Sequence, residues 1–168
     1  MIKLFYSGTY KVRHELINKN NICELLKDDM RSKIVGDVKD TIYASDGVVL
    51  KNNKNVKYIG GFYYEKENPN KSTCENVVCE ELRQIDECDI IVANLMNYSA
   101  IASITEILYG AMKGKRVVIF CNPKITNYEV TGEYWFPILA AKEMDKNIEV
   151  KFTECEDDIV DYINSLGD

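Results

Sequence analysis

The chain has 168 residues, of which 46% are hydrophobic and 29% charged, a composition that excludes a disordered or low-complexity segment. Its 21 Lys and Arg against 27 Asp and Glu give a net charge of −6, which disfavours a polynucleotide partner. The sequence contains no run of about twenty apolar residues that could cross a membrane. We therefore expect one globular domain over residues 1–168.

Short apolar runs alternate with segments of helical period along the chain, which is typical of an α/β fold with a parallel sheet. We predict a first strand at residues 2–6 and a helix over about 12–30. Residues 37–65 are predicted to hold short strands at 41–43, 48–50 and 56–59, joined by a hairpin and long loops.

The second half of the chain has a sharper pattern. A capping box at residues 72–75 predicts a helix to about Glu87, whose apolar face is Cys74, Val78, Leu82 and Ile85. Strands are predicted at 89–95, 116–121 and 148–152, and helices at 103–113, 133–145 and 157–166. Gly114 is placed to end the first of these helices in a left-handed cap. Together these elements predict an open α/β sandwich of about five strands.

Ligands bind such sheets outside the carboxyl ends of the strands, which directs attention to the loops after Tyr6, Leu95 and Cys121. The loop after Leu95 enters a helix predicted to begin at Ser103, so Glu106 lies within one turn of that helix start. Ser103 and Glu106 also have the spacing of a capping box, in which the glutamate only satisfies a backbone N–H. Both interpretations of Glu106 remain open at this point.

Four segments carry a resemblance to a known family: residues 4–8, 58–64, 86–93 and 103–115. They resemble the nucleoside 2-deoxyribosyltransferase-like family, which includes nucleotide N-glycosidases. The resemblance implies a flavodoxin-like, Rossmann-like sandwich with mainly parallel strands and helices on both faces. It also implies a small nucleoside or nucleotide substrate and a homodimer or higher homo-oligomer, which a monomer in light scattering would contradict.

The resemblance also implies residue roles. Glu106 is the nucleophile that attacks the anomeric carbon, and Glu81, eight residues before Asp89, is the acid that protonates the departing base. The resemblance and the predicted loops give the expected substrate-binding residues Phe5, Tyr6, Ser7, Gly8, Gly61, Phe62, Asn97, Ser99 and Ser103. No cofactor or metal is expected, because the chain has one His and no CxxC pair, and its cysteines are expected to be free thiols in the cytoplasm.

Phe5, Ala100 and Ala102 differ from the family's usual Tyr, Asp and Gly. These differences motivate two alternatives. One is a nucleotide-binding or sensing module that keeps the fold without catalysis, and the other is a TIR-like NAD glycohydrolase, which also uses a glutamate in a cleft.

Overall fold

A six-stranded sheet in the order β2-β3-β1-β4-β5-β6 organises the computed structural model, which describes residues 1–8, 30–35, 47–61, 74–98, 100–126 and 132–167. Within these residues the one antiparallel pairing is between β2 and β3. The strands are β1 (Ile2–Ser7), β2 (Val48–Val49), β3 (Val56–Gly60), β4 (Ile90–Leu95), β5 (Arg116–Cys121) and β6 (Ile148–Phe152).

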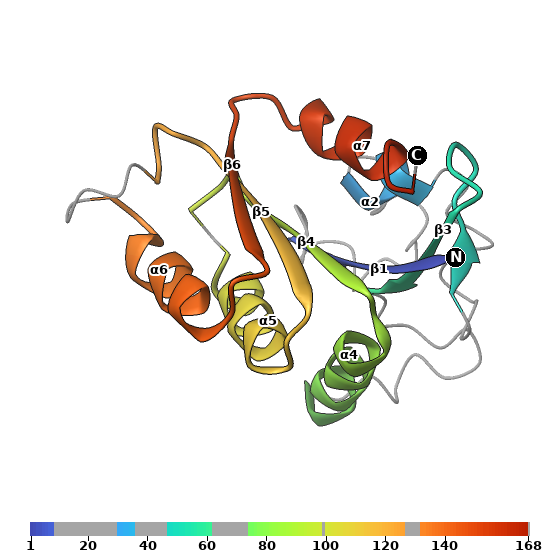
Figure 1. Cartoon of the computed structure of the whole chain (residues 1–168), viewed down its shortest axis with the longest axis horizontal. Helices are drawn as coiled ribbons and strands as arrows, with labels where there is room; N and C mark the ends of the chain where they lie inside the picture. Colours follow the sequence, from blue (N-terminus) through green and yellow to red (C-terminus); the bar gives the residue numbers. More distant parts are fainter. Residues whose placement is uncertain (9–29, 36–46, 62–73, 99, 127–131, 168) are drawn as a thin grey trace, which may run out of the picture.

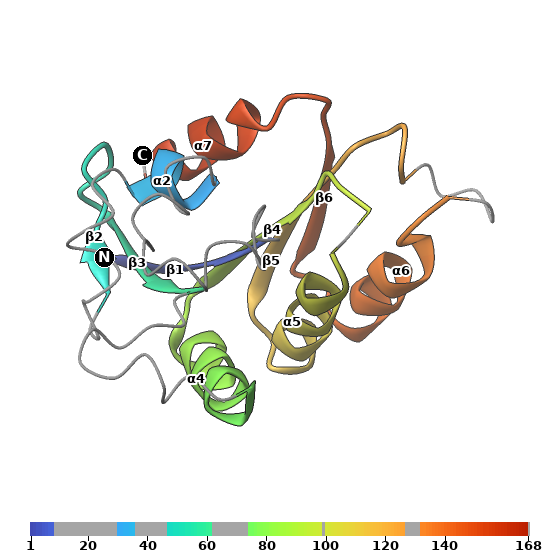
Figure 2. The same ribbon diagram turned by 180° about the vertical axis from the view of Figure 1, so that it is seen from behind.

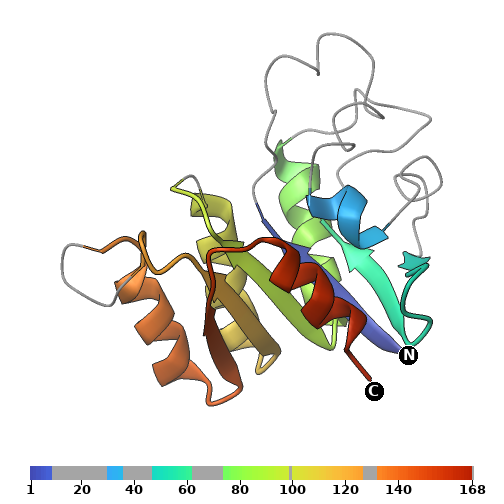
Figure 3. The same ribbon diagram turned by 90° about the horizontal axis from the view of Figure 1, so that it is seen from above.

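Helices cover both faces of the sheet, as Figures 1 and 2 show from opposite sides. Helices α2 (Met30–Val35) and α7 (Asp157–Asn164) lie on one face, and α4 (Cys74–Glu87), α5 (Ile101–Met112) and α6 (Trp135–Met144) lie on the other. Figure 3 shows β1 running from the N-terminus towards the end of the sheet where α2 and the beginning of α4 lie. The observed fold is therefore a Rossmann-like α/β sandwich, as predicted, but its sheet has six strands where about five were expected.

Each face of the sheet has its own core because alternate residues of a strand point to opposite sides. Leu4 and Tyr6 of β1 belong to the core beneath α2 and α7, whereas Phe5 belongs to the core beneath α4, α5 and α6. Strand β4 is buried along its whole length, which is the reason for its continuous apolar sequence. By the same alternation, Ser7 faces the side of α4 and α5.

Most predicted boundaries in the second half of the chain are confirmed. The bounds of β5 and β6 are those predicted, Gly114 has a φ of 66°, and Pro137 lies in the first turn of α6. The prediction of an apolar helix face was wrong at Val78, which is 52% exposed, although Ile85 is fully buried. The predicted strand at 41–43 and nearly all of the predicted helix at 12–30 lie outside the described residues.

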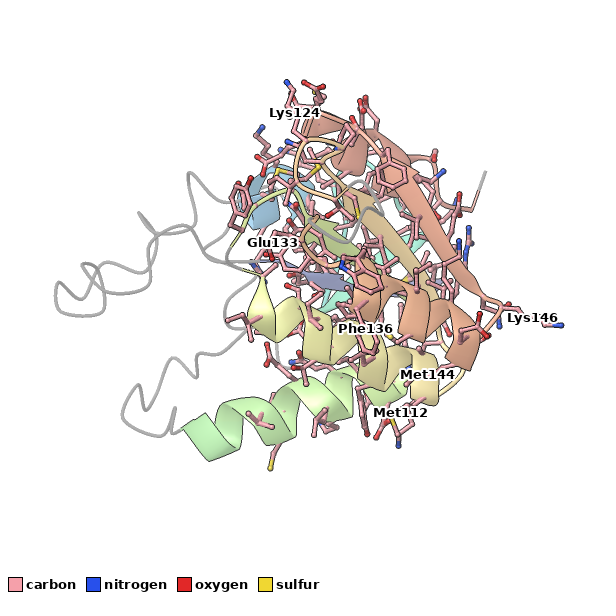
Figure 4. The ribbon with its side chains drawn as sticks, turned by 90° about the vertical axis from the view of Figure 1, so that its left-hand side faces the viewer. Met112, Lys124, Glu133, Phe136, Met144 and Lys146 are labelled. Carbon is pink, nitrogen blue, oxygen red and sulfur yellow. The ribbon has the colours of Figure 1, made fainter. Side chains whose placement is uncertain are left out.

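Several large apolar side chains remain exposed on the outer side of α5 and α6. Figure 4 shows Met112, Phe136 and Met144 on this side, where they are 72%, 67% and 54% exposed. Among the described residues, no helix has both the length and the apolar character needed to cross a bilayer.

Candidate active site

The carboxyl end of β1 lies at the point where the strand order reverses. Strand β1 pairs with β3 on one side and with β4 on the other, and Ser7 is opposite Ala93 of β4. In α/β sheets of this kind the crevice at such a switch point is where ligands bind. The side chains around Ser7 and Gly8 are therefore the first place to look for a functional site.

Glu106 of α5 points to this end of β1 and is 8% exposed. Its carboxylate accepts a hydrogen bond from the Ser7 hydroxyl, which spans 99 residues of sequence. A buried carboxylate held by a side chain from another element is not acting as a helix cap. The capping-box interpretation of Glu106 is thus wrong.

The start of α5 explains this outcome. The helix begins at Ile101, two residues before Ser103, and no side chain caps it. Instead, the N–H of Ala100 donates to the Tyr134 hydroxyl at 3.2 Å, and that hydroxyl donates to the carbonyl of Asn97 at 2.9 Å. Because Tyr134 anchors the helix start, Ser103 lies inside the helix and is 2% exposed.

Glu81 of α4 meets Glu106 of α5. Burial, and next the negative charge of Glu81, raise the pKa of Glu106 from 4.5 to about 7, and a hydrogen bond between the two carboxyl groups acts in the same direction. Two carboxylates form such a bond only when one of them carries a proton. The pair therefore shares one proton, and it loses this proton near neutral pH.

Arg31 approaches the same place from the opposite layer. This residue of α2 is 2% exposed, and its Nη2 donates to the carbonyl of Gly8 at 3.0 Å. Its guanidinium lies over the ring of Tyr6, 5.1 Å from the centroid. The positive charge of Arg31 lowers the pKa of Glu106, in opposition to the effect of Glu81.

Two further polar contacts hold the strand ends around the pair. The Tyr6 hydroxyl accepts a hydrogen bond from Asn94 Nδ2 at 3.0 Å. The N–H of Gly61 donates to Gln84 Oε1 at 3.1 Å, which ties the end of β3 to α4. Gly61 has a φ of 93°, and a Cβ there would lie 3.0 Å from the Tyr6 carbonyl oxygen and 3.2 Å from Arg31 Nε.

The other predicted site residues fall in different places. Phe5 is fully buried, and its ring occupies the position where a side chain of Gly60 would lie. Asn97 lines a cavity of about 440 Å³ at the ends of β4, β5 and β6, whose lining includes neither Glu81 nor Glu106. Phe62 and Ser99 lie outside the described residues. The structure thus brings together Tyr6, Ser7, Gly8, Gly61, Glu81 and Glu106 around the end of β1.

Sequence reasoning missed Arg31. A signal was available, because Arg31 precedes Ile34 and Val35 by three and four residues and so shares their helical face. An arginine on an apolar face is a buried cation, and a buried cation requires an anionic or polar partner.

The described part of the chain was searched for side chains that could bind a metal ion together. No group of three or more His, Cys, Asp or Glu side chains there is placed to hold a metal ion. What the arrangement offers chemically is a pair of carboxyl groups with one proton between them.

Comparison with known proteins supports the fold. No protein-family profile and no curated protein matches the sequence. Among solved structures, the chain is similar to the CMP N-glycosidase BcmB of Clostridium botulinum, with 11% identity, a TM-score of 0.50 and coverage of 96% of this chain and 97% of that chain. It is also similar to a 2-deoxyribosyltransferase of Leishmania mexicana, with 13% identity, a TM-score of 0.48 and coverage of 99% of both chains. At these identities the first similarity shows that the chain has the fold implied by the resemblance in sequence.

Proposed function

We propose that this protein cleaves or transfers the N-glycosidic bond of a nucleoside or nucleotide by double displacement. The observation that carries the proposal is that Glu81 lies against the buried Glu106 at the carboxyl end of β1, where burial and the charge of Glu81 raise the pKa of Glu106 to about 7. Glycosidic chemistry of this type needs one carboxylate to attack carbon and one carboxylic acid to protonate the leaving group. A pair holding a single proton near neutral pH supplies both.

In the first step, a Glu106 carboxylate oxygen bonds to C1′ while the C1′–N bond breaks. The electron pair of that bond passes to the base nitrogen, which takes the proton from Glu81. In the second step, the Glu81 carboxylate accepts a proton from water as the water oxygen bonds to C1′, and the ester to Glu106 breaks. A second base in place of water makes the same enzyme a transferase.

The similarity to a CMP N-glycosidase agrees with this proposal at the level of the fold. The described residues identify neither the base nor the sugar, so the test uses a panel. Deoxynucleosides, ribonucleosides and their 5′-monophosphates are incubated with the protein, with and without a second free base, and base release or exchange is followed by chromatography. Glu106→Gln is expected to abolish turnover, whereas Glu143→Gln, at an exposed position of α6, is expected to retain it.

Leaving-group chemistry tests the role of Glu81. An N7-methylated purine nucleoside carries a cationic base that departs neutral without protonation. Glu81→Gln is therefore expected to slow the cleavage of ordinary nucleosides much more than the cleavage of the N7-methylated nucleoside. Equal loss on both substrates contradicts the acid role, and turnover that survives in Glu106→Gln contradicts the whole mechanism.

The same panel separates the alternatives. Thermal stabilisation by a nucleotide, following RT ln(1 + [L]/Kd) and without turnover, would favour a binding module. Nicotinamide release from NAD would favour the NAD glycohydrolase instead.

A further inference from the structure

The outer face of α5 and α6 carries its large apolar side chains at its two ends. Near the beginnings of the two helices, Ile101 and Phe136 are 81% and 67% exposed. Met112 and Met144, the last residues of the same helices, are 72% and 54% exposed. Met112 lies about three helical turns after Ile101, so both project from one side of α5. Apolar side chains that gather on one exposed face mark a surface that another molecule covers.

Helices α5 and α6 lie side by side and run in the same direction, because each follows one of two neighbouring parallel strands. The hydroxyl of Tyr134, just before α6, contacts the residues just before α5, so the two helices begin at the same level. A two-fold axis across the middle of this face, at right angles to the helices, exchanges its two ends between two copies. Phe136 of one copy then faces Met144 of the other, and Ile101 faces Met112.

Residue spacing on both helices is symmetric about the middle of the face. The outward side chains of α5 follow one another at intervals of four, three and four residues: Ile101, Thr105, Leu108 and Met112. On α6, Ala140 lies midway between Phe136 and Met144, and its small side chain allows two helices to approach closely. Because both patterns read the same in either direction, two copies packed antiparallel present matching positions to one another.

Charges at the ends of α6 favour a second copy of this chain over a different partner. Glu133 and Lys146 are exposed just before and just after the helix, and Figure 4 shows them at opposite ends of the face. The ten residues of α6 between them span about 15 Å, too far for an ion pair within one chain. The two-fold axis brings Glu133 of each copy to Lys146 of the other. The exposed Lys142 and Glu143 carry opposite charges and cancel.

We propose that the outer face of α5 and α6 binds a second copy of this chain, with the helices of the two copies antiparallel. Sedimentation equilibrium of the full chain at micromolar concentration is expected to give twice the mass of one chain, which is 19.3 kDa. Met112→Glu and Phe136→Glu are each expected to raise the dissociation constant at least about tenfold, because each puts a charge in place of a buried apolar anchor. The matched control is Val49→Glu on β2, at the opposite edge of the sheet from β6, where Val49 is 38% exposed. This control is expected to keep the dimer.

Exchange of the end charges tests the direction of packing. Glu133→Lys and Lys146→Glu are each expected to weaken association about threefold to tenfold, because each places like charges opposite one another. The two substitutions together in one chain are expected to restore association, since the charges are then exchanged in both copies. Circular dichroism confirms that each variant is folded before its mass is measured.

Three outcomes would overturn the inference. A monomeric unaltered protein would mean that a different partner covers this face. An assembly that Met112→Glu and Phe136→Glu leave unchanged would have its interface elsewhere. Failure of the double exchange to restore association would exclude the antiparallel arrangement. Because no substrate enters these measurements, their result is independent of the reaction proposed above.

Discussion

At the scale of single residues, the hydrogen bond from Ser7 to Glu106 is the contact that joins β1 to the carboxyl pair. Phe5 is the position at which the family that the sequence resembles has a tyrosine hydroxyl. Phe5 and Ser7 lie on the same face of β1, since they are two residues apart, and the hydroxyl of this chain comes from Ser7.

Ser7→Ala is expected to lower the rate of base release about tenfold to a hundredfold, because a hydrogen bond to a charged group contributes about 1.5–3 kcal/mol. The rate is measured at saturating substrate together with the melting temperature. Ser165→Ala removes the hydroxyl of an exposed serine, which donates to the Tyr162 carbonyl, and is the matched control. A Ser7→Ala enzyme with an unchanged rate would show that Glu106 does not depend on this donor.

At the scale of elements, the contact between β1 and β3 places the end of β1. Phe5 pairs with Gly60 next to a shift in register between Leu4 and Phe5, and a Cβ at Gly60 would lie 2.0 Å from Phe5 Cδ2. Gly60 is therefore needed for the close approach of a ring rather than for an unusual φ. Ser7 follows Phe5 by two residues, so this contact also sets where its hydroxyl lies.

Gly60→Ala is expected to destabilise the fold by about 2 kcal/mol, because the new methyl group would overlap the fully buried Phe5 ring and displace it. Urea unfolding measures the change in the free energy of unfolding. In a double-mutant cycle, Phe5→Leu is expected to recover part of the loss in the Gly60→Ala background. If the changes in the free energy of unfolding caused by the two substitutions simply add, there is no direct clash between the two side chains.

At the scale of the whole molecule, the shared proton links the stability of the fold to pH. The unfolded chain releases the Glu106 proton near pH 4.5, whereas the folded pair keeps it to about pH 7. Between these values the folded state binds more protons, so its stability falls as the pH rises. Stability from the protonated pair is fully present below about pH 4.5 and is lost above pH 7.

Glu106→Gln removes this dependence while keeping a side chain of the same shape. The variant is expected to be about 3 kcal/mol more stable than the unaltered protein at pH 8, with little difference at pH 4.5. Urea unfolding at pH 4.5, 6 and 8 measures the trend, with Glu143→Gln as the exposed control. A difference that stays constant over this range would mean that Glu106 titrates normally in the folded state.

The sequence by itself determined the α/β class and most strand positions in the second half of the chain, because periodicity reports which faces are buried. It also singled out Glu106 and Glu81 through a resemblance that survives in short segments. The exposure of Val78 and the true start of α5 depended on neighbours distant in sequence, such as Tyr134 for α5.

Only the tertiary structure decided the chemistry of the pair. Residues 7, 31, 81 and 106 come from four elements, and their meeting depends on how both helical layers reach the end of one strand. A carboxyl pKa reflects burial and charge within a few ångströms, and no spacing along the chain carries that information. Arg31 is the clearest case, because its charge acts on a group 75 positions away in the sequence.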